Sequence, residues 1–202
     1  MKICSLIFCF IITITTFSQS NVSLQGGLNF SNVIAEGATY IDHESIYFLH
    51  AGLEISFKIT DKINFITLMQ YSQKGNGNNN PISSYFSPKL RLHYVDVIPT
   101  IEYKIIDALG LYGGANIGYL FRADDQFHSE SWKKIENNPF NDIDMGFVIG
   151  TRIYFGNVGI HAHWNRGIKN LNTIISTDIN GNPVDEISFK NSNFQVGLAI
   201  YL

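Results

Sequence analysis

Cysteine is nearly absent from the sequence, since Cys4 and Cys9 are its only two. Both lie in an N-terminal stretch with a basic second residue, an apolar run and small side chains near its end, which predicts a secretory signal peptide over residues 1–18. A membrane anchor is the alternative, but the run is shorter than the roughly 20 apolar residues that a spanning helix needs. We therefore expect cleavage before Gln19 and one exported domain, residues 19–202, without a disulfide or a cysteine-bound metal.

Long apolar runs and basic blocks are both missing after residue 18. The formal net charge is −3, so we expect no nucleic-acid partner. Without a spanning helix, a chain can enter a membrane only as a closed β-barrel, because only closure pairs every backbone N–H and C=O group in lipid. Proline is scarce, whereas glycine and aromatic residues recur in alternating segments, and the period of those segments decides the fold class.

The C-terminal segment shows the clearest period of two. One face is apolar throughout: Phe194, Val196, Leu198, Ile200 and Leu202. The other face is small or polar: Asn193, Gln195, Gly197, Ala199 and Tyr201. This pattern is typical of a transmembrane strand, whose outer face meets lipid while its inner face fills a narrow interior.

Eight segments share this alternation: residues 22–31, 47–59, 63–73, 90–105, 111–121, 144–155, 158–165 and 192–202. Tight connections follow the second, fourth and sixth, and connections of about fifteen to twenty-five residues follow the first, third, fifth and seventh. The sequence therefore predicts an all-β fold, an eight-stranded antiparallel up-and-down transmembrane β-barrel with short periplasmic turns and long extracellular loops. In a soluble ligand-binding barrel the apolar face would point inward, which would leave the charged residues opposite the aromatic face unexplained.

The fourth segment contains an irregularity. Apolar residues alternate in one phase from Leu90 to Tyr94 and in the opposite phase in the rest of the segment, which predicts a β-bulge near Tyr94. Pro99 also argues against a regular ladder there, because proline cannot donate a ladder hydrogen bond. The preceding stretch, residues 74–89, is rich in glycine and asparagine and predicts a loop.

Charged and histidine side chains fall on the inward face. Nine of them form a predicted polar lumen cluster: Glu54, Lys58, Asp96, Glu102, Lys104, Asp144, Arg152, His161 and His163. Eight strands enclose an interior just wide enough for side chains to fill, so we expect these groups to pair across a packed lumen, with a pore for small solutes as the alternative. His161 and His163 could share a metal ion with a third ligand from a neighbouring strand. We expect them to fill the lumen instead, and we predict no metal, cofactor or catalytic residue.

A lipid-modifying enzyme is a further alternative. His93 could act as the base for Ser83, Ser84 or Ser87, but no nucleophile motif surrounds these serines. The long loops also carry aromatic side chains such as Trp132, which could contact a protein partner.

Three segments resemble the PorT-type outer-membrane β-barrel family: residues 27–32 (GLNFSN), 113–119 (GGANIGY) and 165–171 (NRGIKNL). The family carries a Tyr-x-acidic-x-Pro run in its fourth strand, and Tyr94, Asp96 and Pro99 are spaced one residue wider here. The resemblance implies a small barrel in the outer membrane of a Gram-negative bacterium. We expect this barrel to be a monomer in contact with outer-membrane lipid. A structural role or a loop-mediated interaction is the expected function. The tie of the family's namesake to protein secretion implies a secretion component as the alternative.

Overall fold

The computed structural model describes residues 20–37, 44–77, 89–127, 130–177 and 183–202, and the predicted signal peptide lies outside them. No helix long and apolar enough to cross a membrane occurs among the described residues. Their strands are β1 (Ser20–Glu36), β2 (Ile46–Lys58), β3 (Ile63–Asn76), β4 (Lys89–Ile106), β5 (Leu109–Gln126), β6 (Lys133–Lys134), β7 (Ile143–Phe155), β8 (Val158–Gly167), β9 (Asn172–Thr177) and β10 (Pro183–Tyr201).

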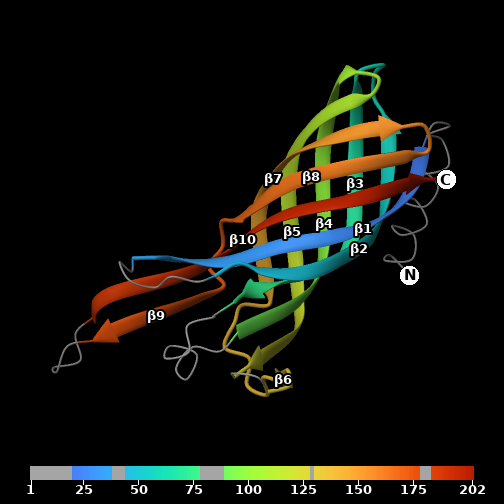
Figure 1. Ribbon diagram of the computed structural model, residues 1–202. Helices are drawn as coiled ribbons and strands as arrows, with labels where there is room; N and C mark the ends of the chain where they lie inside the picture. Colours follow the sequence, from blue (N-terminus) through green and yellow to red (C-terminus); the bar gives the residue numbers. More distant parts are fainter. Residues whose placement is uncertain (1–19, 38–43, 78–88, 128–129, 178–182) are drawn as a thin grey trace, which may run out of the picture.

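Eight of these strands close into a ring (Figure 1). Each pairs with its neighbours in the order β1-β2-β3-β4-β5-β7-β8-β10, and β10 pairs with β1 to complete the circle. The closing antiparallel ladder runs from Ser23 opposite Tyr201 to Glu36 opposite Ser188. The eight-stranded antiparallel barrel predicted from the sequence is confirmed.

Short connections gather at one end of the ring, which we call the turn end. Residues 59–62, 107–108 and 156–157 join β2 to β3, β4 to β5 and β7 to β8. Gly156 has a φ of +60°, the left-handed conformation that a tight hairpin turn favours and that glycine adopts readily. The longer connections lie at the opposite end, the loop end.

The outer face of the ring is apolar and exposed. Leu24, Ile149 and Leu198 are 52%, 60% and 55% exposed, whereas the inward side chains of Asn116 and Gln195 are fully buried. Exposed apolar surface costs about 25 cal/mol per Å² in water, so a continuous wall of such residues requires a lipid environment. A soluble ligand-binding barrel, with its apolar face inside, does not fit this arrangement.

Inward-facing glycines make room for a crowded interior. A Cβ atom at Gly150 would lie 2.5 Å from Cβ of His163 and 2.7 Å from Cζ of Tyr112. A Cβ atom at Gly197 would lie 2.8 Å from Cε1 of His161. Large side chains from neighbouring strands therefore occupy the space that a side chain at either glycine would need.

Several strands run well beyond the length of a membrane span. β1, β4, β5 and β10 contain 17, 18, 18 and 19 residues, whereas roughly 9–11 tilted residues cross a bilayer. The residues beyond the membrane span lie at the loop end, where β9 pairs with β10 and β6 with β5, and Figure 1 shows the β1-β10-β9 sheet projecting from the ring.

The predicted loop over residues 74–89 is wrong at its start, because Lys74–Asn76 continue β3 in register with β4. Residues 78–88 lie outside the described chain.

A bulge does lie near Tyr94, but the predicted change of phase within the fourth segment is wrong, because the extra residue belongs to the neighbouring strand. Tyr94 lies opposite Leu120 and His93 lies opposite Arg122, so Phe121 of β5 is the additional residue. β4 keeps its register with β3 through this point. Its inward alternation therefore continues toward the loop end, and apolar residues there enter the ring.

Apolar side chains fill the ring at the loop end. Six buried residues form a cluster that we call the apolar cap: Val33, Leu92, Tyr94, Leu120, Ala123 and Leu171. Ile135 and Phe140, from the connection between β5 and β7, pack against it. The backbone N–H of Ile135 donates to the carbonyl of Ala123 (2.9 Å), and that of Asn141 donates to Leu171 (2.8 Å). The connections are thus held over the cap by backbone hydrogen bonds.

Candidate functional site: the barrel lumen

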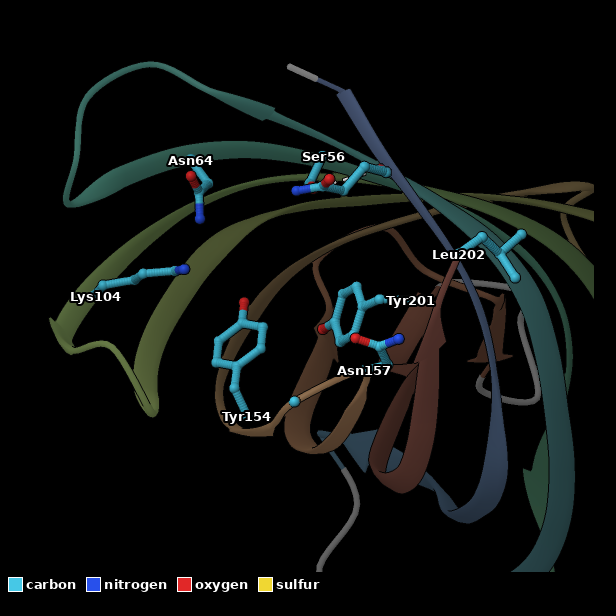
Figure 2. Close-up of a pocket in the computed structure, with 9 residues that line it drawn as sticks. Ser56, Asn64, Lys104, Tyr154, Asn157, Tyr201 and Leu202 are labelled. Carbon is cyan, nitrogen blue, oxygen red and sulfur yellow. Dashed lines mark hydrogen bonds between the residues drawn. The ribbon is translucent and has the colours of Figure 1, made fainter.

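A polar pocket opens into the ring at the turn end (Figure 2). Its volume is about 280 Å³, and it is lined by Asn21, Ser56, Asn64, Lys104, Tyr154, Gly156, Asn157, Tyr201 and Leu202. The ammonium group of Lys104 lies 4.9 Å from the centre of the Tyr154 ring. The buried carboxylate of Glu102 accepts hydrogen bonds from Tyr154 Oη (2.6 Å) and Asn64 Nδ2 (2.8 Å). The pocket therefore offers amide and hydroxyl groups, with the Lys104 cation at its side.

A buried ion pair crosses the lumen next to this pocket. Arg152 of β7 donates from both terminal nitrogens to the Glu54 carboxylate of β2, at 2.7 and 2.6 Å. β2 and β7 are not neighbours in the ring, so the pair ties opposite walls together. Two parallel charge-assisted hydrogen bonds are a strong and directional arrangement. The guanidinium carbon also lies 5.5 Å from the centre of the Tyr112 ring, which places an aromatic wall beside the pair.

Three histidines lie near the middle of the lumen. The ring centres of His50 and His161 are 5.5 Å apart, and those of His161 and His163 are 6.0 Å apart. Tyr112 Oη lies 3.0 Å from Nδ1 of His163. Within the described chain, no three His, Cys, Asp or Glu side chains are arranged so that they could hold a metal ion. A cavity of about 10 Å³ beside His163 and Arg152 has room for about one water molecule.

A second buried ionic group lies closer to the loop end. The Lys74 ammonium contacts Asp96 of β4 (2.9 Å) and Asp144 of β7 (3.1 Å). Ser72 donates a hydrogen bond to Asp96 (2.6 Å), and Asn191 donates one to Asp144 (3.0 Å). Both carboxylates thus have a cation and a neutral donor, which is the condition for burying charge without a large desolvation penalty.

The structure brings most of the predicted lumen cluster inside the ring. Seven of its members are buried: Glu54, Asp96, Glu102, Asp144, Arg152, His161 and His163. Lys104 lies at the pocket wall. Lys58 does not join them, because β2 has reached the turn end at that residue; its ammonium pairs with Asp61 of the turn (2.7 Å), and 45% of its side chain is exposed.

Lys74 is the lumen residue that sequence reasoning missed. The glycine and asparagine residues that follow Lys74 in the sequence predict a loop there, although the Lys74 side chain is completely buried. The available signal was the pair of inward carboxylates, Asp96 and Asp144, which require a cation at their own level.

His93 lies on the outer face of the ring and outside the lumen. Its Nδ1 is 2.6 Å from Tyr71 Oη and its Nε2 is 2.9 Å from Asp124 Oδ2. The serines considered as its nucleophile, Ser83, Ser84 and Ser87, lie outside the described residues. Trp132 lies beside Arg91, with 4.4 Å between its ring centre and the guanidinium carbon.

A closed ring of eight strands with an apolar outer wall and a polar, charge-paired interior defines a small outer-membrane β-barrel. The family described as "outer membrane protein beta-barrel domain" matches residues 17–173. The chain belongs to this family. No curated protein matches the chain.

Solved outer-membrane barrels share the fold. Neisserial surface protein A (NspA) is 11% identical, with a TM-score of 0.55 over 91% of this chain and 99% of its own. Ail, the attachment invasion locus protein of Yersinia pestis, in complex with sucrose octasulfate, is 12% identical, with a TM-score of 0.52 over 91% and 99%. A major outer membrane protein from Thermus thermophilus is 9% identical, with a TM-score of 0.50 over 91% and 100%. At these identities the likeness shows the fold alone.

Proposed function

We propose that the protein is a closed, non-conducting barrel that acts through the surface of its loop end, as a structural or interaction protein without catalysis. The observation that carries this proposal is the filled interior. The Glu54–Arg152 pair and the Lys74 group cross the lumen, and the apolar cap lies at its end. Opening a water path would require these groups to part and to lose the charge-assisted hydrogen bonds between them.

The proposed orientation places the turn end in the periplasm and the loop end outside the cell. It is supported by the short turns and long connections, which outer-membrane barrels arrange in this way. Residues 1–18 act as the signal peptide in a Gram-negative cell, and the barrel works as a monomer surrounded by outer-membrane lipid.

The projecting β1-β10-β9 sheet is the surface that we assign to a protein partner. Among the described residues, β9 pairs on one side only, and its Ile174 and Ile175 are 51% and 58% exposed. Exposed apolar side chains beside an unpaired strand edge favour contact with another protein.

Site-specific photo-crosslinking in living cells tests this assignment. A photoreactive residue at position 174 or 175 should give a discrete protein adduct, whereas the same residue at lipid-facing Leu111 should give none. Adducts at Leu111 alone, or none at any position, would contradict the assignment. Heat-modifiable gel migration serves as the folding control for each variant.

A role in protein secretion is the second candidate. It is supported by the three segments that resemble the PorT-type family. In this second candidate the protein is a member of that family. Deleting the gene should in that case abolish export of secreted proteins while leaving outer-membrane integrity intact. Normal export after deletion would remove this candidate.

A further inference from the structure

A group of cationic side chains lies on the outer face of the ring near the loop end. In the β4-β5-β6 sheet, Arg91 lies opposite Asp124, and Asp124 lies opposite Lys134. Directly opposite residues in an antiparallel sheet share a face, so the three side chains project on the same side. Arg122 joins them from the β5 bulge through a hydrogen bond from its Nε to Asp124 Oδ1 (2.7 Å). We call Arg91, Arg122 and Lys134 the cation cluster.

Asp124 organises this cluster. Its carboxylate is completely buried and accepts hydrogen bonds from Arg91 (2.8 Å) and Arg122. Nε2 of His93 is also 2.9 Å from Oδ2 of Asp124. Burial raises the pKa of Asp124, but the hydrogen bonds from Arg122, Arg91 and His93 outweigh it and hold the pKa below its usual value. The carboxylate is therefore ionised at neutral pH and fixes the orientation of both guanidinium groups.

The cluster keeps an excess of positive charge and free donors. Two guanidinium groups contact one carboxylate and Lys134 lies opposite it on the neighbouring strand, so these four groups carry a formal charge of about +2, because Arg and Lys stay protonated at neutral pH. Among the described residues, Arg122 uses only its Nε in a hydrogen bond, and 46% of its side chain is exposed. Its two terminal amino groups are therefore available to an outside ligand, and the salt bridge already holds the side chain in place.

The position of the cluster indicates what that ligand is. Tyr71 and Phe121 lie directly next to it on the outer face, both exposed, with ring centres 6.2 Å apart. Aromatic side chains on an outer wall mark the level where acyl chains give way to headgroups. The cluster begins one residue beyond Phe121, so it lies at headgroup level on the face that contacts lipid.

We propose that the cation cluster binds a phosphate group of a phosphorylated glycolipid in the outer leaflet. Guanidinium groups recognise phosphate through paired, charge-assisted hydrogen bonds, which Arg122 can make with its free amino groups. Lys134 adds a point charge, and the acyl chains of the same lipid lie against Tyr71 and Phe121. The inference rests on the proposed orientation only for the choice of leaflet; the binding chemistry does not depend on it.

The test uses the full barrel folded in uncharged maltoside micelles, in which orientation plays no part. The probe is bis-phosphorylated lipid A, and the signal is the fluorescence of Trp132, whose ring centre lies 4.4 Å from the guanidinium carbon of Arg91. Trp164→Phe provides the background, because Trp132 and Trp164 are the two tryptophans of the sequence. Arg122→Gln should raise the dissociation constant at least about tenfold, because it removes the paired hydrogen bonds and the loss of even one hydrogen bond to a charged group has that effect.

Two further variants make the result specific. Lys134→Gln, at an exposed position, should also weaken binding, whereas Lys62→Gln, which removes one positive charge in the β2–β3 turn, should leave it unchanged. Heat-modifiable migration verifies that each variant is folded. Unchanged affinity in both Arg122→Gln and Lys134→Gln would overturn the proposal, and so would equal binding of dephosphorylated lipid A. Displacement of lipid A by an equal concentration of inorganic phosphate would overturn the choice of a lipid headgroup in favour of a free-phosphate site.

Discussion

The Glu54–Arg152 pair offers a quantitative test of the filled lumen. Arg152→Met removes the cation and leaves the Glu54 carboxylate buried, with only 2% of its side chain exposed and the hydrogen bond from Ser23 at 3.3 Å as remaining support. An uncompensated buried charge of this kind destabilises a fold by about 3–5 kcal/mol. We expect the free energy of unfolding to fall by that amount.

Two further variants separate the cost of an unpaired buried charge from other effects of the substitution. The double variant Glu54→Leu/Arg152→Met should regain most of the lost stability, because replacing a buried ion pair by apolar residues of similar volume is often neutral. Lys58→Met breaks the exposed pair with Asp61 and should cost less than about 1 kcal/mol.

Urea unfolding in phospholipid vesicles, followed by tryptophan fluorescence and by gel migration of unboiled samples, measures all three variants. A loss below about 1 kcal/mol for Arg152→Met would refute the reasoning, since it would mean that water reaches Glu54 and that the lumen is open at this level. A double variant as unstable as Arg152→Met would show that the cost comes from lost packing and not from unpaired charge.

Three further perturbations follow from the same structure. Gly150→Ala should impair folding, because the new Cβ atom would lie 2.5 Å from Cβ of His163. Gly113→Ala should fold normally, because its new Cβ atom would lie 3.5 Å from the nearest atom, the carbonyl oxygen of Val148. The folded fraction of each variant is measured on gels of unboiled samples. Leu92→Ala, in the apolar cap, should cost about 2–5 kcal/mol in the same urea titration, and a change near zero would show that the cap is loosely packed. The lowered pKa of Asp124 means that its ionised form stabilises the fold above the unfolded pKa of about 3.9, and this contribution disappears as the pH falls through the lower folded value. The urea midpoint of the native protein should therefore drop more steeply between about pH 5 and pH 2 than that of Asp124→Asn, and parallel curves would contradict this assignment.

The sequence predicts the ring well because a membrane wall imposes a strict period of two. A shift of one residue in β2 would point Glu54 toward lipid and Leu53 into the lumen. The same alternation in residues 22–31 and 192–202 determines which side chains of those strands face inward. The period carries no mark of where lipid ends, however. The strands therefore continue into the projecting sheet at the loop end without a change that the sequence alone would reveal.

The candidate site was less predictable for the same reason. Leu92 and Tyr94 are apolar but face inward, because the cap replaces the polar lumen at that level, so their pattern in the sequence wrongly predicts a change of phase within β4. The glycine and asparagine residues that follow Lys74 predict a loop, although Lys74 belongs to β3. Its partners Asp96 and Asp144 come from β4 and β7, and only the closed ring brings them together.

Single-channel recording in planar lipid bilayers tests the central claim most directly. The folded protein, verified by its heat-modifiable migration, should insert without producing conductance steps in salt solution, because ion pairs and the apolar cap fill the lumen. Stable, ohmic steps that scale with the number of inserted barrels would contradict the closed-barrel account, and the lumen would then have to be described as a pore.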